Sequence, residues 1–393
     1  MRRKILLLSI IMSSFFLSTA ALKSQAALDP DVILNRQKAV ALVKGNSASV
    51  RDAVHNEKIA HKNYESQLAK SKTINTEKVL VYHNEYTDED VFYYYEPEMQ
   101  MQMRLLKELT PERMKHAWEI SKISVTINEN IMANTADSLF LGLYGAYQNV
   151  LLSEKFYELA KKAYEREKIR YDNGLITELD LKSSFLDMKE SENGFVKAER
   201  NYENSHRQFN RLSGLPVDYR FLLIGTPWSN NNKIALSEDE AVANALANRM
   251  EIWDLQRQIR LIMQQIEIYR HKDVHRFHKN TKENFDKAIE QMEELKIKLL
   301  DTEYKIEKEI RQAYKELEIS YLDLEMNKQK LLKQKNQLDN ITNQYNEGQI
   351  PASVIEQIEL AVSQMEFSVN ISMITAMNKS DRLYRAISAG PGY

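Results

Sequence analysis

Apolar residues recur at intervals of three and four along two very long stretches of the chain. In the second stretch neither Pro nor Gly occurs between Pro227 and Gly348, so an uninterrupted helix is possible there. Its apolar positions are Met292, Leu295, Leu299, Ile306, Ile310, Ala313, Leu317, Tyr321, Leu324, Leu331, Leu338 and Ile341. The first stretch begins at Pro111, a residue suited to a first helical turn, and continues through Ile120, Ile123, Ile127, Ile131, Leu139, Leu143, Tyr147, Leu151, Leu159 and Ile169. At 1.5 Å per residue, each stretch predicts a helix roughly 90 to 100 Å long that packs against partner helices along one apolar face.

The same Tyr-x-x-Gly-x-Ile motif follows both stretches. Residues 171–180 read YDNGLITELD and residues 345–354 read YNEGQIPASV. Gly174 and Gly348 can take the left-handed conformation that ends a helix and reverses the chain. A new helix is expected at once in both places, because the first motif continues as a Thr-x-x-Asp capping pattern and the second continues with a proline. The sequence therefore predicts two long helical hairpins.

The two hairpins are copies of one repeat. At a constant offset of 174 residues, the matches are Tyr147 with Tyr321, Tyr171 with Tyr345, Gly174 with Gly348, Ile176 with Ile350 and Leu186 with Leu360, while Phe140 matches Tyr314. The copies also begin alike, because Leu28–Asp31 resembles Leu236–Asp239 at an offset of 208. The two offsets assign about 34 additional residues to the first copy. The expected organisation is a first repeat over 27–215, a linker over 216–235 and a second repeat over 236–393.

The additional residues fall in an insert over 73–110. It contains KVLVYHNEY and VFYYYE, which predict strands over Val79–Tyr86 and Val91–Tyr95 joined as a hairpin. A helix extension and a flexible loop are the alternatives for this insert. The equivalent connection in the second copy, HKDVHRFHKN, has no strand pattern. The predicted fold class is therefore mostly α, with two tandem long helical hairpins and at most a small β hairpin in the first repeat.

The first 26 residues have the pattern of an export signal. Arg2, Arg3 and Lys4 precede an apolar run from Ile5 to about Leu17, and small residues follow. Removal of residues 1–26 would change the formal charge from −2 to −6, which makes nucleic acid a poor partner. The chain contains no Cys, and no apolar stretch after the signal is long enough for a transmembrane helix.

In their order, spacing and duplication, these features resemble the TolC-like outer-membrane efflux protein family. The resemblance covers residues 28–390 and includes Leu-Ser-Gly-Leu-Pro at 212–216, after the first returning helix. It implies a homotrimer whose chains each add two helical hairpins to an α-barrel, a passive duct for export of small molecules or proteins. It also implies a periplasmic adaptor (membrane fusion) protein and an inner-membrane pump as partners, and no cofactor. The residues that match the adaptor-contacting hairpin tips of the family are Gly174, Leu175, Ile176, Thr177, Gly348, Gln349, Ile350 and Pro351.

The predicted strands depart from this family. The family's twelve-stranded outer-membrane barrel needs four strands from each chain, whereas this sequence predicts at most two, both short and polar around His83–Glu85. A TolC-like tunnel with a reduced or missing membrane barrel is therefore expected. By resemblance the exported chain belongs at the outer membrane; without a membrane barrel it belongs elsewhere in the cell envelope or at the cell surface.

Two groups of residues have more than one interpretation. His271, His275 and His278 could present imidazoles on one helix face to a metal, but the cations between them favour a solvated connection, so no metal site is predicted. Tyr93–Tyr95 fit either an aromatic belt at a membrane interface or a strand packed on the helices. Tyr147 and Tyr321 lie on the apolar stripes and are expected to pack in the helix seam rather than line a pore.

The sequence contains none of the common motifs that would support an enzyme. It has no Gly-rich phosphate loop, no nucleophile elbow and no His-Glu-x-x-His motif, so catalysis is not expected. The alternative to a transport duct is a non-transporting structural or adhesive coiled-coil protein of the cell envelope, which would use the hairpins as a spacer. A duct needs a water-filled lumen and partner proteins, whereas a spacer needs only a dry core.

Overall fold

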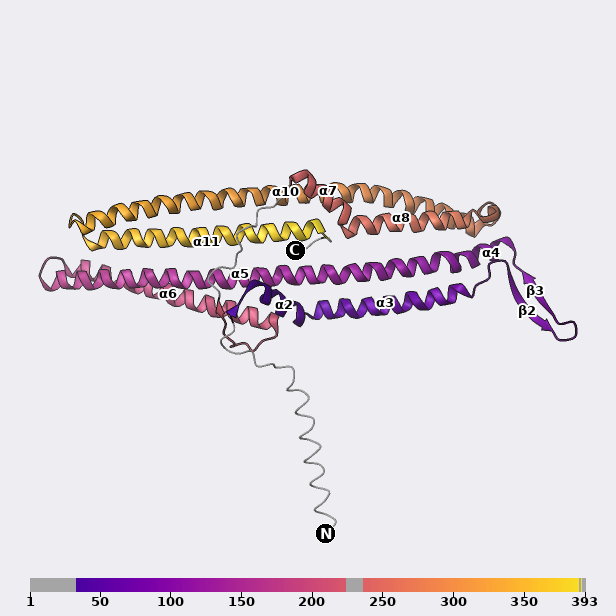
Figure 1. Ribbon diagram of the computed structural model, residues 1–393, viewed down its shortest axis with the longest axis horizontal. Coiled ribbons are helices and arrows are strands. Elements are labelled where there is room, and N and C mark those ends of the chain that lie inside the picture. Colours follow the sequence, from indigo (N-terminus) through magenta and orange to yellow (C-terminus); the bar gives the residue numbers. More distant parts are fainter. Residues whose placement is uncertain (1–32, 224–235, 389, 391–393) are drawn as a thin grey trace, which may run out of the picture.

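The chain forms an elongated bundle of long helices that run nearly parallel to one another (Figure 1). The computed structural model describes residues 33–223, 236–388 and 390. The mostly helical fold class predicted from the sequence is confirmed. The expected export signal, the expected repeat start at Leu28–Asp31 and the 224–235 part of the linker lie outside the described residues.

The first repeat contains one long helical hairpin and one β hairpin. It begins with β1 (Ile33–Leu34), α2 (Arg36–Asn46) and α3 (Ala48–Lys72). The β hairpin of β2 (Lys78–Asn84) and β3 (Glu89–Tyr94) follows, and then α4 (Pro97–Arg104) and a π-helical segment (Leu105–Leu109). The long α5 (Thr110–Asp172) and the returning α6 (Glu178–Ser213) complete the helical hairpin, before β4 (Leu222–Leu223).

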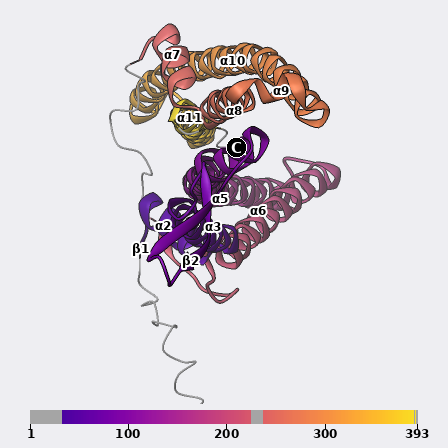
Figure 2. The same ribbon diagram turned by 90° about the vertical axis from the view of Figure 1, so that its right-hand side faces the viewer.

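The second repeat has the same order of helices without a β hairpin. It consists of α7 (Glu238–Asn248), α8 (Met250–Tyr269), the short segments η2 (His271–Asp273) and α9 (Val274–Phe277), α10 (Lys279–Asn346) and α11 (Ala352–Ser388). The 63 residues of α5 and the 68 of α10 correspond to about 95 Å and about 102 Å of helix. Seen along the bundle, the two repeats lie one above the other (Figure 2).

The start of the repeat corrects the register expected from the sequence. Asn35 caps α2 and Ser237 caps α7, each accepting a hydrogen bond from a backbone N–H three residues on. Both helices have 11 residues and then break at one extended residue, Ser47 or Arg249. The offset between the copies is therefore 202 here rather than 208, and the counterpart of Leu236–Asp239 is residues 34–37 rather than Leu28–Asp31.

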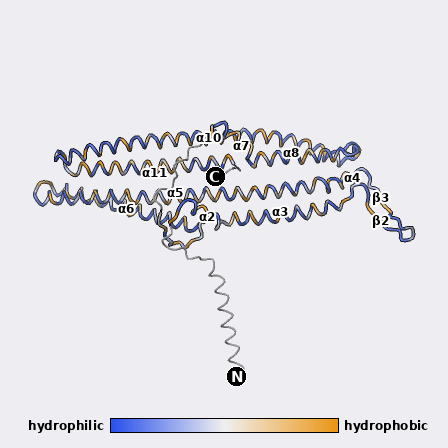
Figure 3. Tube along the Cα trace, viewed as in Figure 1, coloured by the Kyte–Doolittle hydropathy of each residue, from blue (hydrophilic) through white to orange (hydrophobic). Residues whose placement is uncertain are grey.

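Buried residues confirm this register. In the first repeat, Ala39, Val43, Ala136, Leu143 and Phe209 share one apolar core. Their counterparts at offsets of 202 and 174 are Ala241, Ala245, Ile310, Leu317 and Leu383, and these share the core of the second repeat. Apolar positions recur among polar ones along every long helix, as Figure 3 shows. Each repeat thus buries an apolar seam of its own.

The β hairpin predicted in the insert is present and extends beyond the helices at one end of the bundle (Figure 1). Its strands pair antiparallel with an irregularity between Leu80 and Tyr82. Tyr93 and Tyr94 are 54% and 65% exposed, so packing of this strand on the chain's own helices, one of the two expected roles, is not what the structure has. Lys78 instead places its ammonium group 3.5 Å from the centre of the Phe92 ring.

Candidate functional site

The two hairpin tips lie at the same end of the bundle and have the same backbone geometry (Figure 1). Gly174 has φ 73° and Gly348 has φ 72°. The amide of Gly174 donates to the carbonyl of Tyr171 at 2.8 Å, and that of Leu175 donates to Arg170 at 2.8 Å. The same two bonds recur at Gly348 and Gln349, with lengths of 2.8 Å and 2.9 Å. Both α5 and α10 therefore end in a Schellman motif, which satisfies their last carbonyl groups.

The tips differ in how the chain continues after the glycine. Thr177 caps α6 in a complete capping box, since its hydroxyl accepts from the Asp180 amide and the Asp180 carboxylate accepts from the Thr177 amide. In the second tip Pro351 directly precedes Ala352, the first residue of α11.

The predicted tip residues form two exposed turns of different character. Gly174, Leu175, Thr177, Gly348, Gln349 and Pro351 are exposed, whereas Ile176 and Ile350 turn partly inward. Leu175 is 67% exposed at the position where the second tip has the amide side chain of Gln349. The first tip therefore offers an apolar contact, and the second offers a polar one.

A Gly174→Ala variant tests the tip geometry. We expect it to lower the free energy of unfolding by about 1 kcal/mol, because a side chain disfavours the left-handed conformation. Gly194→Ala is the matched control: Gly194 lies inside α6 with nothing within 4 Å of an added Cβ, so alanine should stabilise by about 0.5 to 1 kcal/mol. Urea unfolding of both variants measures the contrast, and equal effects at the two sites would contradict the assignment.

The tip-side half of the bundle is a layer of four helices in the order α6, α5, α11, α10. Contacts join α6 to α5, α5 to α11, and α11 to α10. The inner helices α5 and α11 have a neighbour on each side, whereas α6 and α10 form the two edges of the layer.

Helix α10 is apolar on two opposite faces. Ile306, Ile310, Leu317 and Leu324 are buried against the rest of the second repeat. On the other face a row of apolar side chains is 49% to 70% exposed, and we call it the outer stripe: Ile297, Leu300, Tyr304, Ile319, Leu322 and Met326. A helix with one apolar face needs one neighbour, so a helix with two such faces needs a neighbour on each side.

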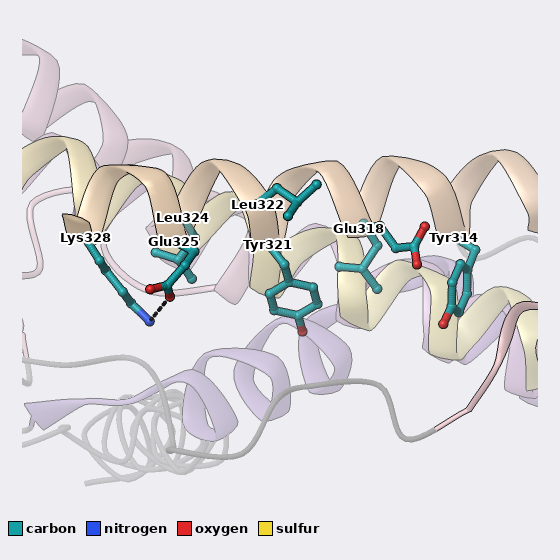
Figure 4. A pocket seen from close by; sticks show the side chains of 8 residues that line it. Tyr314, Glu318, Tyr321, Leu322, Leu324, Glu325 and Lys328 are labelled. Atoms are coloured by element: carbon teal, nitrogen blue, oxygen red, sulfur yellow. Dashed lines mark ion pairs between the residues drawn. The ribbon is translucent and has the colours of Figure 1, made fainter. Parts of the chain in front are cut away.

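An open groove of about 570 Å³ borders the outer stripe, and we call it the edge groove (Figure 4). Its walls are Tyr314, Leu317, Glu318, Tyr321, Leu322, Leu324, Glu325 and Lys328, all from α10. Lys328 pairs with Glu325 at 3.9 Å. Tyr321 also packs against two apolar cores, as its position on the apolar stripe predicts. The groove is apolar at its base and acidic along its rim.

Polar side chains join the two repeats near the middle of the bundle. Asp137 of α5 is 1% exposed and accepts hydrogen bonds from Arg36 Nε at 2.7 Å and from Arg385 Nη2 at 2.5 Å. Arg36 also binds Asp381, and Arg385 also binds Asn134. We call these five residues the central ion cluster; it ties α2 and α5 of the first repeat to α11 of the second.

Further polar pairs join the two repeats on either side of the central ion cluster. Towards the β hairpin end, Arg257 binds Glu112 at 2.5 Å, and His116 Nε2 lies 2.8 Å from Asp254 Oδ1. Towards the tips, Arg166 binds Glu356 at 2.7 Å. At the β hairpin end the repeats also share an apolar core, which contains Met101 and Leu109 of the first repeat and buried residues of α8 and α10. Polar pairs therefore join the repeats along the bundle, and an apolar contact joins them at the β hairpin end.

The three histidines near 275 do not share a helix face. Lys272 and Asp273 have φ values of 48° and 58°, which interrupt the helix between His271 and His275. His271 lies in η2, His275 in α9, and His278 just before α10. His278 pairs with Glu98 at 3.0 Å, and the His275 ring lies 4.5 Å from that of Phe285. The helical spacing of the three histidines in the sequence therefore does not place their imidazoles on one face.

Sites of two other kinds do not occur in the described part of the chain. Across residues 33–223 and 236–388, no three His, Cys, Asp or Glu side chains are grouped so as to hold a metal ion. Nor does any helix within these ranges combine the length and apolar character needed to cross a membrane.

Comparison with known proteins identifies the fold. No family model and no curated protein matches the sequence. Among solved structures, CusC, a former of transmembrane channels, has 10% identity and a TM-score of 0.63, and the match covers 93% of this chain and 96% of that one. The outer membrane protein VceC of Vibrio cholerae has 13% identity and a TM-score of 0.61, with 90% and 96% covered. The open-state MtrE outer membrane channel of Neisseria gonorrhoeae has 14% identity and a TM-score of 0.55, with 91% and 89% covered.

The resemblance to TolC-like efflux proteins is thus confirmed at the level of the fold, over about nine tenths of the chain. The edge groove and the central ion cluster were not among the residues expected from the sequence. The outer stripe left a signal that could have been found, because Ile297, Leu300, Tyr304, Ile319, Leu322 and Met326 lie at a helical spacing of their own. The central ion cluster left no such signal, because its members are far apart in the sequence.

Proposed function

We propose that the protein is a passive export duct of the cell envelope, assembled from three copies of this chain. Each copy contributes its two helical hairpins to a closed ring of helices with a water-filled bore. An adaptor protein contacts the hairpin tips, and an energised pump drives the cargo, which consists of small molecules or proteins. The chain itself makes and breaks no bonds. The likeness in fold to channel proteins of the outer membrane supports this proposal and a location at that membrane.

The observation that carries the proposal is the outer stripe of α10. Burying a Leu or Ile side chain contributes about 1.5 to 3 kcal/mol, so six exposed apolar residues on one face are a strong reason for a partner. The stripe lies on one edge of the helix layer, and the opposite edge is α6. An interface between unlike edges closes into a ring when the rotation between successive copies returns to the start after a whole number of copies. Three copies is the number implied by the resemblance to efflux ducts.

The tips supply the second contact. Their glycine turns are exposed, rigid and repeated, and they lie at the end of the bundle away from the β hairpin (Figure 1). In the assembled ring, three copies would present six such turns around the bore. An adaptor with helical hairpins of its own could engage them through Leu175 at one turn and Gln349 at the next.

An Ile319→Glu, Leu322→Glu double variant tests the assembly. Two carboxylates on the outer stripe would be buried without partners, so we expect a shift from trimer to monomer at micromolar concentration. Sedimentation velocity of the purified mature chain measures this directly. Leu151→Glu is the control, because Leu151 is exposed on the inner helix α5 and its replacement should leave the trimer intact.

Imaging of the purified oligomer separates the duct from a structural spacer. A threefold particle with an open bore supports the duct, whereas a particle with a dry core supports a structural or adhesive role. A wild-type chain that stays monomeric at micromolar concentration would rule out both forms of assembly.

A further inference from the structure

The second edge of the helix layer carries a row of positive charge. On α6, Lys197, Arg200, Arg207 and Arg211 recur at helical spacing with Asn204 between them, and all five are exposed. None of the four cations has an ion-pair partner in the described part of this chain. We call these five residues the basic row. Like charges placed three and four residues apart repel one another, and the neighbouring acid on α6, Glu203, pairs with Arg220 at 3.8 Å instead. An acidic partner from another copy would therefore stabilise the row.

The edge groove of α10 supplies acids with a matching spacing. Glu318 and Glu325 are seven residues apart, as are Arg200 and Arg207, and they lie on either side of Leu322 (Figure 4). Glu318 has no ion pair within the described ranges, and Glu325 has one long ion pair, to Lys328 at 3.9 Å, and accepts a hydrogen bond from Gln329 at 3.0 Å. The two edges of one layer are therefore complementary in charge, with the cations on α6 and the acids of the groove on α10.

The two features also lie at similar heights above the tips. At 1.5 Å per residue, Asn204 at the middle of the basic row is about 39 Å along α6 from Glu178. Leu322 at the middle of the edge groove is about 36 Å along α10 from Asn346. Because both tips point to the same end, copies arranged side by side around an axis bring the row and the groove together, with α6 antiparallel to α10 (Figure 1).

We propose that the edge groove of one copy is the docking site for the basic row of the next copy, and that this charge pairing sets the vertical register between neighbours. The proposal rests on the ring assembly described above and adds the contact that fixes its alignment. The outer stripe alone would bind a neighbouring helix without fixing its height. A displacement by two helical turns leaves only one of the two arginines opposite a glutamate, so the charged rim favours the register in which both pairs form.

Charge reversal tests this pairing without altering the apolar contact. With Glu318→Arg and Glu325→Arg together, the groove would repel the row, and we expect the dissociation constant of the trimer to rise about tenfold or more. The trimer should be weakened to a similar extent by the reversal of the basic row, Arg200→Glu, Arg207→Glu and Arg211→Glu together. The combination of all five changes restores opposite charges and should recover much of the affinity. The effect of each reversal should shrink in 0.5 M salt, because exposed charges are then screened.

Asp323→Arg is the matched control, since Asp323 is an exposed acid on α10 between the two glutamates but outside the groove. Circular dichroism establishes that each variant keeps its helix content. As the chain has no Cys, Asn204→Cys with Leu322→Cys should also give covalent dimers and trimers with a short bismaleimide, whereas either change alone should not.

The outcomes separate this proposal from the one it rests on. A wild-type monomer would overturn the ring assembly itself. A wild-type trimer that tolerates both reversals as well as it tolerates Asp323→Arg would overturn the charge pairing and leave the ring intact. If the variant with all five changes formed no tighter a trimer than either reversal alone, the charge pairing would also be overturned and the ring would remain.

Discussion

An Asp137→Ala variant should lose about 3 kcal/mol of unfolding free energy, the lower end of the range for breaking a buried ion pair. Asp137 is 1% exposed and accepts hydrogen bonds from both Arg36 and Arg385. Without it, Arg385 keeps its hydrogen bond to the neutral Asn134 and a weaker electrostatic interaction with Asp381. The two arginine side chains are 19% and 21% exposed, so water offsets part of the loss. Urea unfolding of the trimer-deficient Ile319→Glu, Leu322→Glu background would isolate this effect within one chain.

Two controls locate the effect in the buried carboxylate. Glu112→Ala breaks the ion pair to Arg257, whose side chains are 40% and 20% exposed, and should cost less than about 1 kcal/mol. Asp381→Asn should be nearly neutral. Burial raises the pKa of Asp381 and Arg36 only partly opposes this rise, so its charged form is not stabilised by folding. If Asp137→Ala cost no more than Glu112→Ala, the buried carboxylate would contribute no more to the contact between repeats than an exposed ion pair.

The parts of the fold that could be predicted from the sequence are those whose signals lie close together along the chain. The long helices and their turns follow from local rules: an apolar residue every three or four positions, a glycine after Tyr171 or Tyr345, and a capping box at Thr177. The β hairpin was predicted for the same reason, from its runs of Val and Tyr. Each of these signals lies within one segment, and the structure confirms them.

Long-range relations were harder to predict. The match of Leu28–Asp31 with Leu236–Asp239 gave the wrong offset, because four residues of capping chemistry resemble one another by chance. The buried pair Ala39 and Ala241 gives the right offset, but only once the cores are known. The central ion cluster joins residues 36, 137 and 381, and charged residues are too common in this chain for such a group to stand out.

The polar contacts between the repeats differ in exposure along the bundle. The pair Arg166 and Glu356 near the tips is more exposed than the central ion cluster, so breaking that pair should cost less unfolding free energy. The largest polar contribution to the contact between repeats is therefore expected from the buried carboxylate of Asp137.

The other large effect expected is a loss of stability on mild acidification, caused by His206. This side chain of α6 is 1% exposed, and neither ring nitrogen has a hydrogen-bond partner among the described residues. It is surrounded by aromatic rings, with that of Tyr202 at 4.8 Å and that of Phe221 at 6.5 Å. Burial, helped by Arg220 and opposed by Glu203, lowers the pKa of His206 from 6.5 to about 4.

A lowered pKa means that the folded chain holds His206 neutral while the unfolded chain takes up a proton below pH 6.5. Stability is therefore complete above pH 6.5 and falls as the pH drops towards 4, by up to about 3 kcal/mol from this residue. His206→Phe keeps an aromatic ring in the same site and removes the titration. The difference in unfolding free energy between pH 7 and pH 5, measured in urea, should be about 2 kcal/mol smaller in this variant than in the wild type. His55→Phe, at an exposed position of α3, should leave the difference unchanged. Equal pH dependence of His206→Phe and the wild type would show that His206 is hydrated or paired, and would remove it as the source of the acid sensitivity.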